Sequence, residues 1–215
     1  MSGHAWVGAS GWSYPSWRPA FYPAGSKPDE LLARYAAKLP AVELNATGYR
    51  LPAAEQFERW REQVPDGFRF AVKAPPLTFR RPDVVAERVR ALGAALGCVR
   101  LVVESPRDDA LLDRLLKAFS GTRLALDLRH ESWSGVEEAL AAADAVRIGD
   151  TNAAGDWRYL RFRDPPYDDT ALTAIADGLR PLLAEGISTY AFFRHEDEPT
   201  APLAALRILE LIDLE

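Results

Sequence analysis

The stretch "VRLVVESPRDDALLDRLLKAFSGTRLALDL" (residues 99–128) contains two short apolar segments separated by a longer amphipathic one. Val99–Glu104 and Arg123–Leu128 have the length and the valine and leucine content of buried strands. Between them, Asp108–Phe119 places its leucines at helical spacing. A strand–helix–strand unit of this size joins neighbouring parallel strands. The stretch therefore predicts an α/β fold built on a parallel sheet.

The same alternation continues in both directions from this unit. The remaining strand predictions are Trp6–Ala9, Ala41–Asn45, Phe68–Lys73, Ala145–Gly149, Trp157–Arg163 and Ser188–Arg194. The remaining helix predictions are Leu31–Leu39, Ala53–Val64, Pro82–Leu96, Gly135–Ala143, Thr170–Glu185 and Pro202–Ile212. The connection between the sixth and seventh strands is too short for a full helix.

Eight strands with helices after nearly all of them predict a single domain, residues 1–215, folded as a small TIM-like (β/α)8 barrel with a shortened connection between strands six and seven. The competing architecture is an open doubly wound sheet, which usually carries a glycine-rich phosphate-binding turn after its first strand. Gly8 and Gly11 do not form that turn, so the barrel is preferred.

Composition narrows the classes of function. The formal net charge of −5 argues against a general nucleic-acid binder. The single cysteine, Cys98, excludes an intrachain disulfide and a cysteine-rich metal site. No apolar segment approaches the roughly 20 residues of a membrane span, and we see no secretory leader. We therefore expect a cytoplasmic protein without a membrane partner.

Charged side chains share one face of several predicted strands. In the fifth strand the leucines occupy one parity, which we expect to face the helices, while Asp127 and Arg129 occupy the other. The same parity argument places six further polar or charged side chains inside, which are Glu43, Asn45, Lys73, Arg147, Arg161 and Arg163. Glu104, at the end of the fourth strand, is a further candidate.

Two interpretations of these interior charges stay open. Burying them costs several kcal/mol per ion unless they are paired, hydrated or serve a ligand. A self-neutralising network explains Glu43 and Asp127 with two arginines, and a salt bridge to Glu43 is the simplest role for Lys73. The cations outnumber these carboxylates, however, which favours a pocket for a phosphate or carboxylate group, because Arg forks match such oxyanions.

Acid/base chemistry has two histidine candidates. His130 and His195 each follow the end of a predicted strand, where either can act as a general acid or base or instead bond to the backbone. Lys73, with a pKa lowered by nearby arginines, is also a candidate for Schiff-base formation.

Metal binding is the weaker alternative. The residues that converge from different strands are Glu43, Glu104, Asp127, Asp150 and His195. The local excess of Arg and Lys disfavours a divalent cation at that place, so we predict no metal and no cofactor.

Five motifs, in order, carry a resemblance to a known family. They are "GASGWSYPSW" (8–17), "FYP" (21–23), "VELNATGYRLP" (42–52), "FRFAVKAP" (68–75) and "LRHESW" (128–133). In this order and spacing they resemble domain-of-unknown-function family 72, the YecE-like proteins. The resemblance implies a TIM-like barrel but no established reaction. The site residues it implies are Ser10, Gly11, Trp12, Glu43, Asn45, Tyr49, Arg50, Lys73, Pro75, Arg129 and His130.

The chain also departs from the pattern of that family. No histidine follows the Lys-x-Pro segment, where Phe79 stands instead, and Glu104 begins a segment that is usually Gln-Leu-Pro. Arg163 takes the place of a His-Gly pair, and His195 lies in the usually Asn-rich end of the eighth strand. These changes are typical of a subgroup with a more anionic substrate or of a member that has lost the shared chemistry.

Together these observations predict an enzyme that acts on an anionic, phosphate- or carboxylate-bearing small molecule by acid/base chemistry at the carboxyl ends of the strands. Hydrolase, lyase and isomerase chemistry all fit. The catalytic candidates are Glu43, Lys73, Asp127 and His130. The candidates for ligand contact are Ser10, Trp12, Asn45, Tyr49, Arg50, Arg129, Arg161 and Arg163. The alternative is a non-catalytic binding protein for a nucleotide, a phosphorylated metabolite or a nucleic-acid segment, with Trp12 and Tyr49 stacking on bases.

Overall fold

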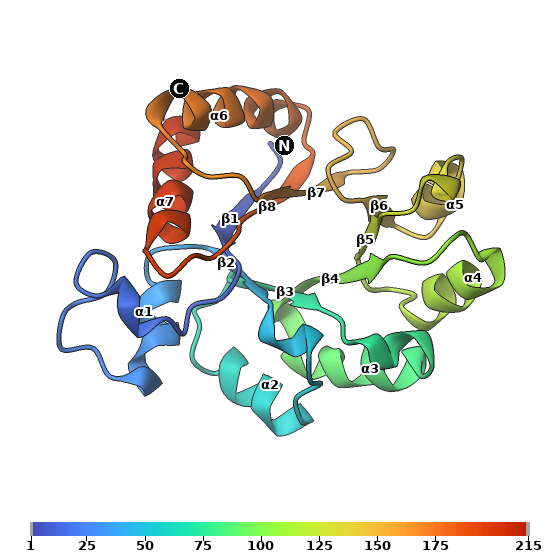
Figure 1. The fold of residues 1–215 in the computed structure, drawn as a ribbon, viewed down its shortest axis with the longest axis horizontal. Coiled ribbons are helices and arrows are strands. Elements are labelled where there is room, and N and C mark those ends of the chain that lie inside the picture. Colours follow the sequence, from blue (N-terminus) through green and yellow to red (C-terminus); the bar gives the residue numbers. More distant parts are fainter. Residues whose placement is uncertain (1, 214–215) are drawn as a thin grey trace.

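The computed structural model describes residues 2–213 of the chain, and its strands and helices alternate along the sequence (Figure 1). The strands are β1 (Ala5–Ala9), β2 (Ala41–Leu44), β3 (Arg69–Lys73), β4 (Leu96–Val103), β5 (Leu124–Leu128), β6 (Ala145–Arg147), β7 (Trp157–Phe162) and β8 (Ser188–Phe193). The α-helices are α1 (Leu31–Ala36), α2 (Ala54–Arg61), α3 (Pro82–Val89), α4 (Asp109–Ala118), α5 (Glu137–Ala142), α6 (Asp169–Ala184) and α7 (Thr200–Asp213). Every predicted strand and helix is therefore confirmed as an element.

The strands form two parallel sheets rather than one closed ladder. One sheet has the order β1-β8-β7 and the other has the order β2-β3-β4-β5-β6, and all pairings within them are parallel. The α/β fold with parallel strands is confirmed. Within residues 2–213 the strands do not form the closed eight-stranded ladder of a barrel, because the strand hydrogen bonds stop between β1 and β2 and between β6 and β7.

Side chains and loops connect the two sheets where the ladder stops. The Tyr35 hydroxyl of α1 accepts a hydrogen bond from the Ala9 amide at 2.7 Å and donates one to the Ala41 carbonyl at 2.9 Å. Gly8 permits this approach, since a Cβ atom there would lie 1.9 Å from the Ala41 oxygen. At the other edge, the amide of Gly149 donates to the carbonyl of Tyr159 in β7. The two sheets thus meet at both seams.

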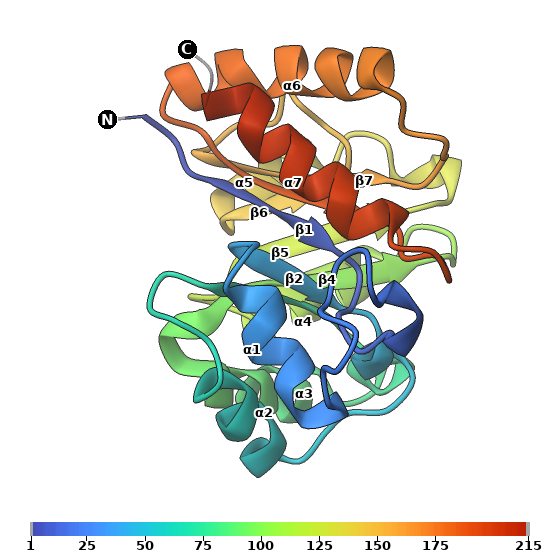
Figure 2. The same cartoon turned by 90° about the vertical axis from the view of Figure 1, so that its left-hand side faces the viewer.

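The helices lie around the outside of the strands (Figure 1). Turning the molecule by 90° shows α6 and α7 on one side of the strands and α1, α2 and α3 on the opposite side (Figure 2). The apolar faces of the helices cover the outer side chains of the strands, which form the larger core.

The interior between the two sheets is a second, smaller core. The sheet of β1, β8 and β7 contributes large aromatic side chains, which are Trp157, Tyr159, Tyr190 and Phe192. The other sheet faces them with small side chains, which are Ala41, Ala71, Cys98 and Ala125. Small side chains opposite large ones fill the interior without gaps at this level. Charged residues occupy the next level, toward the carboxyl ends of the strands.

Two local features bear on the sequence predictions. The helix predicted over Pro82–Leu96 is shorter, because α3 ends at Val89 and the chain continues as a 3-10 turn with Gly93 at φ 54°. A residue with that backbone conformation cannot continue a helix, so β4 starts at Leu96. The connection between β6 and β7 carries no helix over residues 148–156, as predicted.

Candidate functional site

A fully buried carboxylate lies at the centre of the charged level. Glu43, in β2, is 0% exposed. Its Oε2 accepts a hydrogen bond from the Tyr159 hydroxyl at 2.5 Å and lies 3.5 Å from Nη1 of Arg100. Its Oε1 accepts a hydrogen bond from Nε of Arg161 at 3.1 Å. The carboxylate is therefore held by Arg100 of β4, in the same sheet, and by Tyr159 and Arg161 of β7, in the other sheet.

Asp127 of β5 forms the second centre of this network. Its Oδ2 lies 2.6 Å from Arg100 Nη2, 2.7 Å from Arg163 Nη2 and 3.5 Å from Arg129 Nη2. Arg129 also pairs with Glu104 at 2.5 Å, where the Glu104 side chain is 72% exposed. Arg100 thus connects the two carboxylates, since its guanidinium contacts both Glu43 and Asp127. We call the pairs around Glu43 and Asp127 the buried network.

Both carboxylates of the buried network are stabilised in the ionised form. Burial alone raises the pKa of Glu43, but Arg161 and Arg100 outweigh it and hold the pKa below its ordinary value. Burial likewise raises the pKa of Asp127, and its hydrogen bond to Arg100 reverses the shift. Glu43 is 0% exposed, and its carboxylate is in contact with Tyr159, Arg161 and Arg100.

A cavity of about 520 Å³ opens above the buried network. Its lining comes from the carboxyl ends of the strands and from the segments that follow them. We call it the rim cavity, and it is lined by Tyr14, Asn45, Ala46, Tyr49, Lys73, Arg161, Arg194 and His195. This is the end of the strands at which the charged parity residues were expected.

Two cations of the rim cavity have no carboxylate partner among residues 2–213. Lys73 donates from Nζ to the Asn45 amide oxygen at 3.3 Å and lies 4.9 Å from the centre of the Tyr49 ring. The prediction of a salt bridge between Lys73 and Glu43 is wrong, because the Glu43 carboxylate pairs with Arg100 and Arg161 instead. Burial, with Arg100 second, lowers the pKa of Lys73. Arg194 is exposed and forms no ion pair with the described residues.

His195 completes the lining of this cavity. Its Nδ1 lies 3.1 Å from Oγ of the fully buried Ser10, which also accepts the His195 backbone amide at 3.0 Å. The ring stacks on Tyr14 with centroids 4.9 Å apart. Burial, followed by Arg161 and Arg194, lowers the pKa of His195, so the ring is neutral near pH 7. Ser10 thus positions the ring, and Nε2 remains for a ligand.

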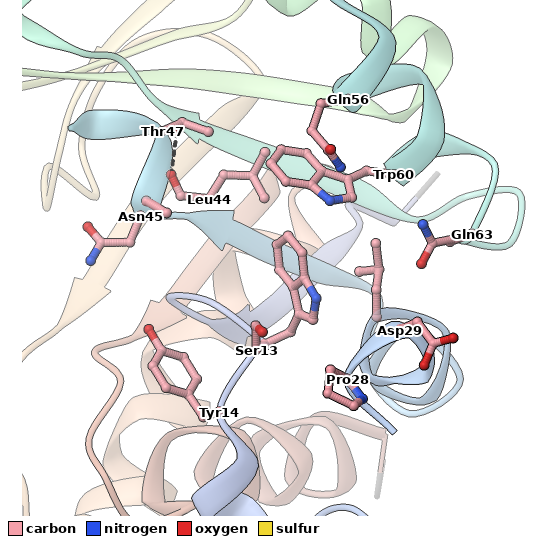
Figure 3. A pocket seen from close by; sticks show the side chains of 13 residues that line it. Ser13, Tyr14, Pro28, Asp29, Leu44, Asn45, Thr47, Gln56, Trp60 and Gln63 are labelled. Carbon is pink, nitrogen blue, oxygen red and sulfur yellow. Dashed lines mark hydrogen bonds between the residues drawn. The ribbon is translucent and has the colours of Figure 1, made fainter. Parts of the chain in front are cut away.

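A second pocket of about 560 Å³ adjoins the rim cavity (Figure 3). It lies between the loop after β1, the start of α1 and the helix α2. We call it the aromatic pocket, and it is lined by Trp12, Ser13, Tyr14, Pro28, Asp29, Leu32, Leu44, Asn45, Ala46, Thr47, Gln56, Trp60 and Gln63. Trp12 therefore lines this pocket instead of the rim cavity. Tyr14, Asn45 and Ala46 border both spaces.

The structure does not bring all the predicted ligand contacts to one place. Ser10, Asn45, Tyr49, Lys73 and Arg161 meet at the rim cavity or directly beneath it.

Arg129 and Arg163 instead contact Asp127, and neither lines the rim cavity. Arg50 is exposed and lines neither space. His130 is also apart from the cavity: its Nδ1 accepts from the Ser132 amide at 3.2 Å and caps the turn Glu131–Trp133.

The inner parity predicted for Arg147 is wrong. Its guanidinium reaches outward to Glu137 of α5 at 3.0 Å and to the carbonyl of Trp133. Val146 faces the interior in its place. The strand β6 is only three residues long, which is too short for alternation to fix the parity.

Three residues of this region are absent from the sequence prediction. Arg100 shares the parity of Glu104 but stands inside an apolar run, and that shared parity is the signal that would find it. Tyr159 shares the parity of Arg161 in the same way. Arg194 directly precedes His195 and carries no periodic signal of its own.

Two features of the described residues bear on other classes of function. Within residues 2–213, no three His, Cys, Asp or Glu side chains are arranged to hold a metal ion. Over the same residues, none of the helices has the length and apolar character needed to cross a lipid bilayer.

Comparison with known proteins identifies the family. The model of "Protein of unknown function DUF72" matches residues 6–215. The chain belongs to the DUF72 family. It is 39% identical over 70 residues to the UPF0759 protein YecE of Escherichia coli K12, a match that covers 33% of this chain and 23% of that protein. It is 32% identical over 69 residues to the UPF0759 protein YunF of Bacillus subtilis 168, covering 32% of this chain and 23% of YunF. The matched segment thus spans about a quarter of each relative.

A solved structure of the same family shares the fold. A DUF72 family protein of Enterococcus faecalis V583 superimposes with a TM-score of 0.77 at 16% sequence identity, over 98% of this chain and 96% of that one. At that identity the likeness concerns the arrangement of the elements. The family resemblance expected from the motifs is confirmed.

Proposed function

We propose that this DUF72 protein is an enzyme that binds an anionic small molecule in the rim cavity and moves a proton with His195. One observation carries the proposal. Lys73 and Arg194 line the cavity without a carboxylate partner among residues 2–213, beside a histidine whose pKa is lowered. Unpaired cations around a neutral imidazole provide charge for an oxyanion and a group that exchanges protons near pH 7.

The cations differ in how firmly they are held. Arg161 is fixed by Glu43 at its Nε atom, so its guanidinium presents the remaining N–H groups in one orientation. Lys73 is held by one amide oxygen and Arg194 by no ion pair in residues 2–213. One fixed fork with two adjustable cations suits a phosphate or carboxylate, because the fork sets orientation and the other two neutralise charge.

His195 supplies the proton transfer in this proposal. When Nδ1–H donates to Ser10 Oγ, Nε2 has a free electron pair and takes a proton from the substrate. The resulting imidazolium returns that proton to another atom of the substrate or to water. In the opposite tautomer, Ser10 donates to Nδ1 and Nε2–H acts as the acid. Hydrolysis, elimination and isomerisation all use such a step.

We further propose that the fold works as a TIM-like (β/α)8 barrel that is open at two seams. The parallel direction of all eight strands supports this, as do the Tyr35 bridge between β1 and β2 and the Gly149–Tyr159 bond beside β6. Active sites of such barrels lie at the carboxyl ends of the strands, where the rim cavity is.

The first experiment is a thermal-shift screen at low salt with phosphorylated sugars, nucleotides and organic acids, followed by calorimetric titration of the compounds that bind. A ligand at 100 times its Kd adds about 2.7 kcal/mol to the free energy of unfolding, which raises Tm by several degrees. We expect Lys73→Ala and Arg194→Ala each to weaken binding about tenfold or more, because each removes a charge-assisted contact. Arg114→Ala, which removes an exposed arginine of α4, is the matched control and leaves Kd unchanged.

The same titrations separate catalysis from binding. His195→Gln keeps the ligand affinity within about threefold but lowers turnover of the bound compound by about 100- to 10,000-fold. Binding that is equally strong in Lys73→Ala and Arg114→Ala contradicts the anion site. Binding without any turnover in the wild-type protein contradicts the enzyme and leaves the non-catalytic binding protein.

A further inference from the structure

The aromatic pocket is the immediate neighbour of the rim cavity. Tyr14, Asn45 and Ala46 border both spaces, so no other segment of the chain separates them. A molecule held by its charged end in the rim cavity therefore has the aromatic pocket as the nearest place for the rest of its atoms.

The walls of this pocket suit a flat ring. Trp12 and Trp60 meet edge to face, with ring centroids 5.3 Å apart and planes at 85°. Both indoles are only half-buried, and the apolar side chains of Leu32 and Leu44 lie beside them. An indole face that remains accessible inside a pocket stacks well on a planar ring, whatever the identity of that ring.

The edge of the pocket carries amide groups that are partly unused. Gln56 accepts from Arg59 through Oε1, and Gln63 donates from Nε2 to the Arg59 carbonyl. The side-chain nitrogen Nε2 of Gln56 and the side-chain oxygen Oε1 of Gln63 have no hydrogen bond to the described residues. One donor and one acceptor near a stacking surface match the edge of a heteroaromatic ring. A sugar ring carries more hydroxyls than these mostly apolar walls satisfy.

We propose that the ligand of this protein carries, besides its anionic group, a planar heteroaromatic ring that lies in the aromatic pocket, as a mononucleotide does. This inference rests on the proposed function, because the anionic group occupies the rim cavity described above. The ring is recognised by Trp12 and Trp60 through stacking, and by Gln56 and Gln63 at its edge.

The test compares ligands that differ only in the ring. Ribose 5-phosphate is titrated by calorimetry beside AMP, GMP, CMP and UMP, with the wild-type protein, Trp60→Leu and Trp6→Leu. At least one mononucleotide binds the wild type about tenfold more tightly than ribose 5-phosphate, because stacking of a base on one indole increases the affinity by about that factor. Trp60→Leu removes most of this advantage and leaves the Kd of ribose 5-phosphate unchanged.

Two further variants keep the test interpretable. Trp6 is also half-buried but lines a pocket that shares no residue with the aromatic pocket or the rim cavity, so Trp6→Leu leaves the advantage intact. If Trp60→Leu does not fold, Gln63→Ala replaces it. Gln63 is exposed, and its loss changes the order of affinity among the four mononucleotides without changing the Kd of ribose 5-phosphate.

Failure of this inference is distinct from failure of the proposed function. Equal affinity for ribose 5-phosphate and all four mononucleotides, with every Kd weakened by Lys73→Ala, overturns the ring site and leaves the anion site. Absence of binding by all five compounds overturns the ring site too, and the wider anion screen then decides the proposed function on its own.

Discussion

The buried network and the rim cavity both contain basic side chains but surround them differently. In the buried network, Arg100 has carboxylates on both sides, and Arg161 and Arg163 each have one. In the rim cavity, Lys73 has an amide oxygen, and Arg194 has no ion pair within residues 2–213. The two regions share Arg161, whose Nε atom belongs to the network and whose side chain also lines the cavity.

The difference distinguishes charged side chains that pair with one another from cations that keep the capacity to bind a ligand. In a buried ion pair each charge offsets part of the loss of hydration of the other, so the pair is explained without a ligand. A cation in a cavity without a carboxylate keeps its capacity to bind an anion. The number of charges in the interior therefore says little about function until the partner of each one is known.

The largest expected effect comes from breaking the buried network at its centre. Glu43→Ala leaves Arg100 and Arg161 buried without that carboxylate, and we expect it to lower the free energy of unfolding by about 3–5 kcal/mol. Denaturation by urea measures the loss. Lys73→Ala, in the rim cavity, costs less than about 1 kcal/mol in the same assay. Equal losses in the two variants abolish the distinction between the regions.

A change of pH is expected to have an intermediate effect on stability. His195 in the rim cavity and the carboxylates of the buried network titrate in different pH ranges. The pKa of His195 is lowered by burial and then by Arg161 and Arg194, so the unfolded chain takes up this proton first as pH falls below about 6.5. Stability is therefore lost as pH falls from there through the lowered pKa. The pKa values of Glu43 and Asp127 are also lowered, so their contribution is present above about pH 4 and is lost below it.

Urea denaturation at a series of pH values separates the two contributions. His195→Gln removes the loss that begins near pH 6.5 and keeps the loss below about pH 4. Asp127→Asn, if it folds, reduces the second loss and keeps the first. A wild-type stability that stays constant between pH 7 and 5 contradicts the assignment for His195.

The smallest effect is expected at the exposed edge of the network. Glu104 pairs with Arg129 at 2.5 Å, but its side chain is 72% exposed, so solvent screens the pair. Glu104→Ala changes the free energy of unfolding by about 0–1 kcal/mol. A loss as large as that of Glu43→Ala would extend the buried network to the surface.

The fold was largely predictable because its signal is local and repeated. The leucine parity of β5 placed Asp127 in the interior, and the alternation of strands and helices placed every element in order. The two seams were not predictable, because whether β1 pairs with β2, or β6 with β7, depends on the distance and orientation of the strands in the folded molecule. Gly8 and Tyr35 determine one seam, and they are far apart in the sequence.

The site was predictable only where strand parity could be read. Glu43 and Arg161 were found in this way, while Arg147 failed because β6 is too short. The choice between His130 and His195 depends on loop geometry, which no periodic pattern encodes. The aromatic pocket is assembled from four separate segments of the sequence, so no single local motif predicts it.

The open seam between β1 and β2 has a mechanical consequence for the cavity. Lys73 is the last residue of β3, and Asn45 and Tyr49 follow β2 in the same sheet. Arg161, Arg194 and His195 belong to or follow strands of the other sheet. The cations and the imidazole are thus distributed over the two sheets. Between β1 and β2, the Tyr35 hydroxyl hydrogen-bonds to both sheets, at Ala9 and Ala41. A shift of one sheet relative to the other would change the distance between Lys73 and His195 without breaking the hydrogen bonds within either sheet.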